Sequence, residues 1–167
     1  MSKARKVNSI DDRSLLDRAL VLSLNNAHAK ETSALDSASL SALLEMSFYA
    51  RGIDRGETAF LIALDQNAPY ANPNFRWFKE FRKSFVYVDR IIVAASARGQ
   101  GIARILYDDL FAVAQRAGQD RVVCEVNLNP PNPTSQAFHV TMGFKEVGRA
   151  DLHCGTKTVC YFEKSMQ

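Results

Sequence analysis

Residues 98–103 read Arg98-Gly99-Gln100-Gly101-Ile102-Ala103, and this stretch joins two segments of different hydrophobic period. The preceding run, Phe85–Val93, is rich in β-branched and aromatic residues and predicts a strand. After the stretch, apolar residues recur at helical spacing, which predicts a helix that begins inside the glycine loop and ends at Ala117. The first amides of a helix lack partners within it and carry partial positive charge. The arrangement therefore predicts a turn that binds phosphate or pyrophosphate.

The loop differs from two common nucleotide-binding signatures. It lacks the Gly-Lys-Ser/Thr ending of a P-loop, and no third glycine follows at the Rossmann spacing. Two interpretations therefore stay open from these residues alone. In one, the glycines only permit a tight turn; in the other, they let the backbone approach a ligand closely.

Composition and length set the broad class of protein. The length of 167 residues and the composition predict a single domain over residues 14–167, preceded by a flexible leader over residues 1–13. A net charge of +3 with dispersed basic residues argues against nucleic acid as a partner. Three cysteines without zinc spacing and three widely separated histidines predict reduced thiols, a cytoplasmic location and no bound metal. No apolar run has the length of a membrane span, which predicts no membrane partner.

The remaining periodicities predict an α/β fold with a mixed sheet in the order β-α-β-β-α-β-α-β-β. Strands are predicted at Arg18–Leu24, Glu57–Leu64, Phe85–Val93, Arg121–Val126, Lys145–Gly148 and Thr158–Glu163. Helices are predicted at Ser37–Phe48, Arg76–Lys83, from the glycine loop to Ala117, and from about Thr134 to Met142. Ser37 or Ser39 is expected to cap the first helix, and Arg51-Gly52 to end it.

A second motif follows the glycine loop. Arg98-x-x-Gly101-x-Ala103 is followed, about thirty residues on, by Asn132-x-x-Ser135-x-x-Phe138-His139-x-x-x-Gly143-Phe144. Together the two motifs resemble the acyl-CoA-binding signature of the GNAT superfamily of N-acetyltransferases, over about residues 84–148. The resemblance implies a GNAT-like fold: a mostly antiparallel sheet of about six or seven strands with about four flanking helices. Two parallel strands, Phe85–Val93 and Arg121–Val126, would splay apart and hold the cofactor.

The resemblance also implies acetyl-CoA as the acyl donor. The amides of residues 98–103 would hold the pyrophosphate, and backbone groups near Val93 would pair with the pantetheine arm and polarise the thioester carbonyl. For three residues a structural role without cofactor contact stays open: Arg104 as a solvated helix residue, Asn132 as a turn residue and Ser135 as a helix-start polar group. The expected cofactor contacts are Ile92, Val93, Arg98, Gly99, Gln100, Gly101, Ile102, Ala103, Arg104, Asn132, Ser135 and Phe138.

Three residues are candidates for proton transfer. GNAT enzymes often carry a tyrosine at the position of His139, where it protonates the departing CoA thiolate, and imidazole suits this role near neutral pH. A structural histidine is the alternative, with Tyr87, Tyr107 or Tyr161 as the donor. Glu125 and Asp89 are candidates for the general base, because a carboxylate within a strand is costly unless it is paired or used. Ion pairs to Arg90 or Arg121 are the alternative for both acids.

The function implied by the resemblance is acetyl transfer to a primary amine by direct attack in a ternary complex. The acceptor would be a small molecule or a peptide, and GNAT proteins often form homodimers. Aromatic residues between positions 65 and 81 are expected to line the acceptor pocket or to cover one end of the sheet. Two other functions stay open: a non-catalytic acyl-CoA-binding regulatory domain and a nucleotide-binding regulatory fold.

Overall fold

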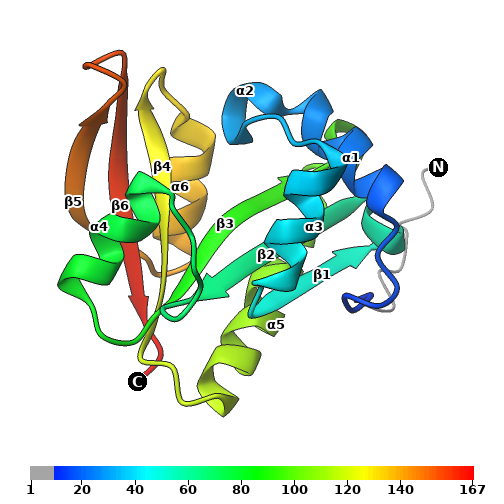
Figure 1. The fold of residues 1–167 in the computed structure, drawn as a ribbon, viewed down its shortest axis with the longest axis horizontal. Helices are drawn as coiled ribbons and strands as arrows, with labels where there is room; N and C mark the ends of the chain where they lie inside the picture. The colour runs from blue at the N-terminus through cyan, green and yellow to red at the C-terminus, as the bar shows by residue number, and fades with distance from the viewer. Residues whose placement is uncertain (1–9) are drawn as a thin grey trace. The chain divides into compact units, whose positions relative to one another are not determined.

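The computed structural model describes residues 10–167, which form six α-helices, two short 3-10 helices and six strands (Figure 1). The α-helices are α1 (Arg18–Ala27), α2 (Ala29–Thr32), α3 (Ser37–Glu45), α4 (Pro73–Phe81), α5 (Ile102–Arg116) and α6 (Pro133–Thr141). The strands are β1 (Tyr49–Ile53), β2 (Ala59–Asp65), β3 (Val86–Val93), β4 (Arg121–Asn129), β5 (Lys145–Leu152) and β6 (Lys157–Ser165).

The strands follow the hydrogen-bonded order β1-β2-β3-β4-β6-β5. The pairs β1–β2, β4–β6 and β5–β6 are antiparallel, and β3–β4 is parallel. These findings confirm the predicted mixed, mostly antiparallel sheet with one parallel pair. The number of helices was predicted too low, because α1 was taken as a strand and the short helix α2 was not foreseen.

The chain divides into two compact units. One consists of Met1–Ala63 with Arg90–Leu110, and the other consists of Leu64–Asp89 with Phe111–Gln167. The first unit contains α1, α2, α3 and β1, together with the glycine loop. The second unit contains α4, β4, α6, β5 and β6.

In the first unit, the strand predicted at Arg18–Leu24 is wrong, because this segment lies in helix α1. The Asp17 side chain caps the helix by accepting the amides of Ala19 and Leu20, at 2.9 and 3.2 Å. Val21 and Leu24 are buried three residues apart, as on one face of a helix. The alternation of leucines that suggested a strand is therefore incidental.

The first unit also contains a strand that the sequence did not predict. Arg51-Gly52 was expected to end the preceding helix, but α3 stops at Glu45 and both residues lie within β1. A side chain at Gly52 would place its Cβ 2.7 Å from the Ala59 carbonyl oxygen, so this glycine allows close backbone packing. The cap of α3 also differs from the prediction, because Asp36 rather than a serine accepts the Ser39 amide.

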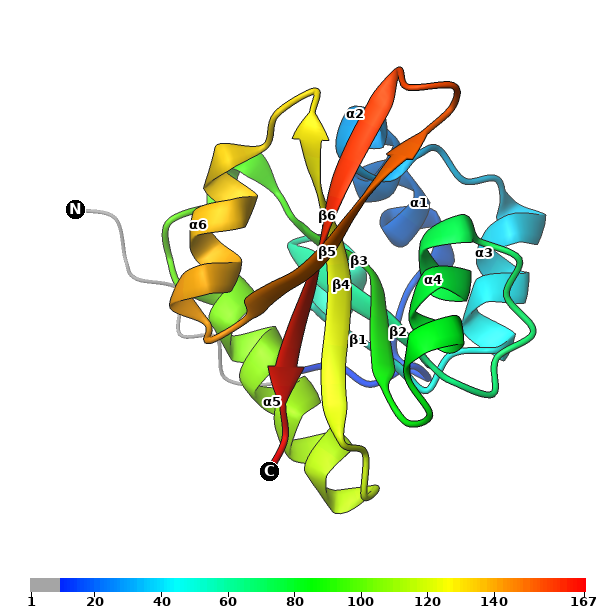
Figure 2. The same cartoon turned by 90° about the vertical axis from the view of Figure 1, so that its left-hand side faces the viewer.

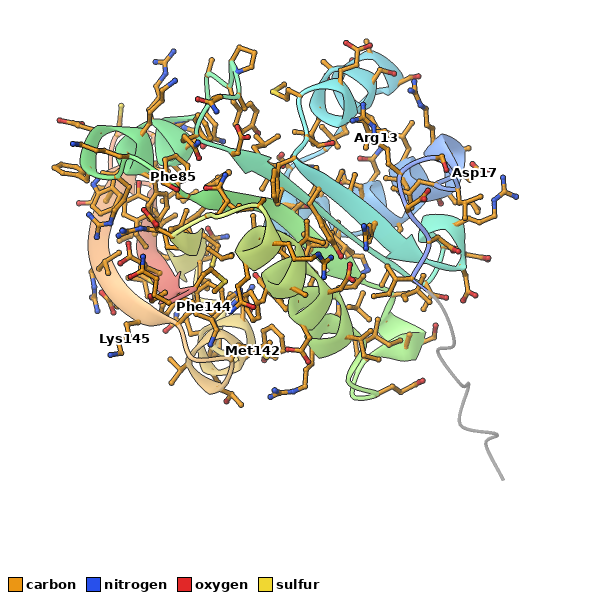
Figure 3. All side chains as sticks on the ribbon, turned by 90° about the horizontal axis from the view of Figure 1, so that it is seen from below. Arg13, Asp17, Phe85, Met142, Phe144 and Lys145 are labelled. Carbon is orange, nitrogen blue, oxygen red and sulfur yellow. The ribbon has the colours of Figure 1, made fainter. Side chains whose placement is uncertain are left out.

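In the second unit, α4 and α6 lie on opposite faces of the strands β4, β6 and β5 (Figure 2). Helix α4 begins at Pro73, three residues before the predicted start at Arg76, because Asn72 caps it by accepting two backbone amides. Its Phe75 and Phe78 are buried. Helix α6 lies where it was predicted, and the side chains of Met142 and Phe144 are buried on either side of the turn that leads to Lys145 at the start of β5 (Figure 3).

The register of β4 and β6 decides which side chains share a face. Glu125 pairs with Tyr161, and Cys124 pairs with Phe162. Because side chains alternate along a strand, Glu125 and Tyr161 project to one face and Cys124 and Phe162 to the other. Tyr161 contacts α4, so the Glu125 face is the one that α4 covers.

The parallel strands part within the second unit. Their ladder joins Val86 to Val122 and Tyr87 to Val123, and the described residues that follow in this unit add no further pair. The separation therefore begins just before Asp89 and Glu125. The predicted splay of these two strands is present at this point.

No helix within residues 10–167 is long and apolar enough to cross a membrane.

The structure describes only part of the predicted N-terminal leader. Of the predicted leader, residues 1–9 lie outside the described part of the chain. Asp11, which falls within that leader, exchanges two backbone hydrogen bonds with Gly52, at 2.7 and 2.9 Å.

Candidate active site

The half-buried Glu125 and the buried Tyr87 form a hydrogen-bonded pair where the parallel strands part. The Tyr87 hydroxyl donates a hydrogen bond to Glu125 Oε1 at 3.0 Å. Glu125 Oε2 is buried and has no hydrogen-bond partner among the described residues. The pKa of Glu125 is raised to about 7, chiefly by burial; the hydrogen bond from Tyr87 opposes this shift and the nearby charge of Asp89 adds to it. Glu125 can therefore exchange a proton near neutral pH.

Asp89 lies two residues beyond Tyr87 on β3 and so projects to the same face. The Tyr70 hydroxyl donates to Asp89 Oδ1 at 2.5 Å, and the rings of Tyr70 and Tyr87 lie 6.4 Å apart. Asp89 and Tyr70 are only half-buried, whereas Tyr87 is fully buried. The four side chains thus form a polar cluster in which Tyr70, Asp89 and Glu125 are half-buried and Tyr87 is buried.

Aromatic side chains of α4 support this cluster. Trp77 stacks on Tyr161 with ring centroids 4.2 Å apart, and the Tyr161 hydroxyl donates to Asn74 Oδ1 at 2.9 Å. Burial raises the pKa of Tyr161 to about 12 and that of Tyr87 well above its usual value, so both phenols are protonated at neutral pH. Asn74 is a supporting residue that the sequence analysis missed, because its contact with β6 is not encoded locally.

His139 lies on the other face of the sheet. Its ring stacks on Phe162 at 6.0 Å and meets the edges of Phe138 and Phe144. Nδ1 donates to the Ser135 carbonyl at 2.7 Å, and burial lowers the pKa of the imidazole. His139 is therefore neutral at pH 7 and is separated from Glu125 by the sheet itself.

The other predicted residues of α6 lie around its first turn. Asn132 caps the helix, since its Oδ1 accepts the Ser135 amide at 3.2 Å. The Ser135 hydroxyl lies 3.3 Å from His139 Nδ1. Phe138 is half-buried beside the histidine ring. Ser135 thus lies at the helix start, as its alternative has it, and Asn132 is the helix cap. Cofactor contacts by these two residues stay a prediction.

In the first unit, the glycine loop is exposed and has the backbone that an anion site needs. Gly99 and Gly101 adopt φ values of +77° and +76°, and no atom lies within 4 Å of a Cβ built at either residue. Arg98, Gln100 and Arg104 are exposed as well, while Ile102 anchors the first turn of α5 in the core. Open space in front of a helix N-terminus fits a polyanionic cofactor such as CoA.

The Arg98 side chain contacts two other segments of the first unit, at Val93 and at His28. Its Nε donates to the Val93 carbonyl at 3.3 Å, and its Nη2 lies 3.1 Å from His28 Nδ1. Next to Val93, the Ala94 amide donates to the Thr58 carbonyl, and Ile92 is buried. The predicted cofactor contacts of the first unit therefore form a continuous path from the end of β3 to the start of α5.

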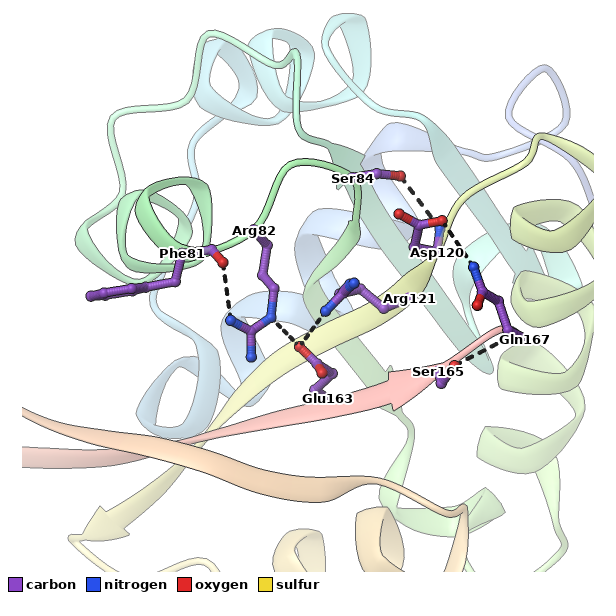
Figure 4. A network of polar contacts seen from close by, with 8 residues as sticks. All are labelled: Phe81, Arg82, Ser84, Asp120, Arg121, Glu163, Ser165 and Gln167. Atoms are coloured by element: carbon purple, nitrogen blue, oxygen red, sulfur yellow. Dashed lines mark hydrogen bonds and ion pairs between the residues drawn. The ribbon is translucent and has the colours of Figure 1, made fainter.

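The arginines considered as ion-pair partners of Glu125 are engaged elsewhere. Arg121 and Arg82 both contact Glu163 Oε2, at 3.3 and 2.6 Å, in the network shown in Figure 4. Arg90 donates to Asn25 Oδ1 at 2.8 Å. Glu125 thus has a tyrosine as its partner. This pairing follows from the parallel register of β3 and β4, which places Tyr87 beside Val123, two residues before Glu125.

Comparison with known proteins identifies the family. The sequence profile of the acetyltransferase (GNAT) family matches residues 25–144. The chain belongs to the GNAT acetyltransferase family. As a member of this family, it is an acyltransferase. A comparison with the sequences of curated proteins found no significant match.

Solved structures of N-acetyltransferases share the GNAT fold of this chain. An N-acetyltransferase from Staphylococcus aureus Mu50 is 18% identical with a TM-score of 0.70, covering 95% of this chain and 98% of that one. A ribosomal-protein-alanine N-acetyltransferase from Brucella melitensis is 19% identical with a TM-score of 0.71, covering 94% and 99%. A protein from Salmonella typhimurium, solved with its cofactor acetyl-CoA, is 17% identical with a TM-score of 0.68, covering 95% and 94%.

Proposed function

We propose that this GNAT protein transfers the acetyl group of acetyl-CoA to a primary amine by direct attack in a ternary complex, with Glu125 as the general base. The observation that carries the proposal is the carboxylate of the half-buried Glu125, which has a pKa of about 7 and one buried oxygen without a partner among the described residues. A base is most effective when its pKa lies near the working pH. An acid placed only for structure would have both oxygens satisfied.

The reaction requires this base because an amine acceptor is protonated at neutral pH. The ammonium must lose one proton before its nitrogen lone pair can attack the thioester carbonyl. Glu125 Oε2 is the atom that receives the proton, directly or through one water, while the Tyr87 hydroxyl fixes Oε1 and so orients the carboxylate. Tyr87 is in this account a positioning residue.

The glycine loop holds the cofactor in this proposal. The amides of residues 98–103 and the start of α5 bind the pyrophosphate, with Arg98 and Arg104 available as cations. Backbone groups of Ile92 and Val93 pair with the pantetheine arm. Asn132, Ser135 and Phe138 of α6 remain predicted cofactor contacts. When bound, acetyl-CoA supplies the activated acetyl group.

His139 stays our prediction for the group that protonates the departing thiolate. Because Nδ1 donates to the Ser135 carbonyl, proton delivery from Nε2 requires the imidazole to bind a second proton first. Burial lowers the pKa of this ring, so the role predicts a loss of rate as the pH rises. Replacing His139 with Gln should abolish that loss along with the donor.

The acceptor is a small molecule or a peptide amine. The likeness in fold to a ribosomal-protein-alanine N-acetyltransferase supports the peptide class. A homodimer and a cytoplasmic location remain expectations.

The test is acetyl transfer by the purified protein with a panel of amines, followed by free thiol release. We expect turnover by wild type, and a loss of about 10²- to 10⁴-fold in Glu125→Gln with CoA affinity unchanged. In His139→Gln, where only the base titrates, the remaining kcat/KM should rise about tenfold between pH 6 and pH 8. Calorimetry with CoA identifies the alternative. Binding of CoA without turnover of any amine would instead indicate a non-catalytic regulatory domain.

A further inference from the structure

The Arg98 side chain is held at two points and keeps other donors available. Its Nε donates to the Val93 carbonyl at 3.3 Å, and Nη2 donates to His28 Nδ1 at 3.1 Å. A guanidinium carries five N–H groups. Within residues 10–167, those that do not point at Val93 or His28 have no hydrogen-bond partner. Arg98 is exposed at the start of the glycine loop, so these donors can bind a ligand.

His28 is the acceptor in its contact with Arg98. A guanidinium donates hydrogen bonds and cannot accept them, so Nδ1 of the imidazole must accept. Nδ1 therefore carries no proton in this pair, and the ring proton lies on Nε2. The contact thus defines both the direction of the guanidinium and the tautomer of the histidine.

The backbone of His28 is fixed at the junction of α1 and α2. Its amide donates to the Asn25 carbonyl at 3.0 Å, and its carbonyl accepts the Glu31 amide at 3.1 Å and the Thr32 hydroxyl at 3.2 Å. An imidazole has only two side-chain torsions, so a fixed backbone leaves its Nδ1 few positions. His28 can therefore determine where the guanidinium of Arg98 lies.

The end of α1 that carries His28 is joined to β3 by a second contact. Asn25 lies three residues before His28 and is buried, and its Oδ1 accepts from Arg90 Nη1 at 2.8 Å. Asn25 Nδ2 donates to the Ser33 carbonyl at 2.9 Å. The imidazole therefore stands on a support that is hydrogen-bonded to the sheet and to the chain beyond α2.

We propose, resting on the function proposed above, that His28 is a positioning residue for cofactor binding. It accepts from Arg98 and so directs the remaining N–H groups of the guanidinium at the pyrophosphate of CoA. A long side chain that is fixed before binding loses less conformational freedom when the ligand arrives. The bond between a guanidinium and a phosphate also depends on direction. His28 itself does not contact CoA.

The experiment compares two substitutions of His28 by calorimetry with CoA. His28→Leu removes the acceptor, whereas His28→Asn keeps an oxygen at the place of Nδ1. We expect Kd to rise about three- to tenfold in His28→Leu and to stay within about twofold of wild type in His28→Asn. Ala27→Leu adds the same side chain at the exposed neighbouring position and is the control that should leave Kd unchanged.

A double substitution separates positioning from a merely structural role. In the background of Arg98→Ala there is no guanidinium to direct, so His28→Leu should not weaken CoA binding further. A structural role of His28 would weaken binding equally in both backgrounds. In acetyl transfer, His28→Leu should raise KM for acetyl-CoA and leave kcat unchanged.

NMR of histidine-labelled wild-type protein tests the contact without the leucine variant. The ring of His28, assigned by the loss of its signals in His28→Asn, should show an unprotonated Nδ1 and a protonated Nε2. The opposite tautomer would overturn the inference.

The outcomes separate this inference from the function on which it rests. An unchanged Kd in His28→Leu, equal losses in the Leu and Asn variants, or a loss that persists in Arg98→Ala would overturn the inference. Binding of CoA and acetyl transfer by wild type would still support the proposed function in each of these cases. Failure of wild type to bind CoA would overturn both.

Discussion

Replacing Glu125 with Gln should stabilise the protein at alkaline pH while it removes the base. Burial raises the pKa of Glu125 to about 7, from the ordinary value of 4.5. The folded state therefore binds this proton more tightly than the unfolded state does. The contribution of Glu125 to the free energy of unfolding is fully present below about pH 4.5 and is lost as the pH rises through 7.

The size of the effect follows from the two pKa values. Their difference is about 2.5, and each pH unit corresponds to about 1.4 kcal/mol, so ionised Glu125 costs about 3 kcal/mol above pH 8. The glutamine variant stays neutral and escapes this cost. Its side-chain carbonyl can still accept the hydrogen bond that Tyr87 donates.

Urea unfolding at pH 5 and pH 8 measures the effect. Between these two values the free energy of unfolding of wild type should fall by about 2–3 kcal/mol more than that of Glu125→Gln. Glu80→Gln, at an exposed position on α4, is the control and should follow wild type. Equal pH dependence in wild type and Glu125→Gln would refute both the raised pKa and the argument for the base.

Gly101→Glu should weaken CoA binding, measured by calorimetry, at least about 100-fold, because it puts negative charge at the start of α5. The control is Gly118→Glu, at a glycine with a similar φ of +72° and equally open space, which should leave CoA affinity unchanged. Unchanged affinity in Gly101→Glu would contradict the cofactor site. Glu163→Gln removes contacts to two arginines and should lower the free energy of unfolding in urea by about 1–2 kcal/mol. Gly56→Ala should lower the free energy of unfolding by about 2–3 kcal/mol and lower Tm, because its Cβ would lie 2.5 Å from Val21 Cγ2 on a backbone with φ +96°. An unchanged Tm would argue against this packing.

The strand, glycine loop and helix around residues 85–117 were predictable because each has a local signal. Period-two and helical patterns meet at the glycines, and these patterns depend little on the rest of the fold. The segments that were predicted wrongly depend on distant contacts. In α1 the local alternation of leucines competes with the Asp17 cap, and in β1 the pairing with β2 overrides the glycine.

The candidate site was predictable in its charges and unpredictable in its geometry. Glu125 and Asp89 could be named because carboxylates within buried strands are rare without a purpose. The hydrogen bond from Tyr87 to Glu125 joins residues 38 positions apart, so it depends on the parallel register rather than on any motif. The same holds for His139, whose packing against Phe162 places it on the opposite face from Glu125.

The central claim is that Glu125 deprotonates an amine that then takes the acetyl group from CoA. The most direct test measures free thiol and acetylated amine in the same reaction, the amine by mass spectrometry, for wild type and Glu125→Gln. We predict one acetylated amine for each thiol released by wild type, and neither product above background in the variant. Thiol release without acetylated amine, or equal rates in the two proteins, would contradict the account.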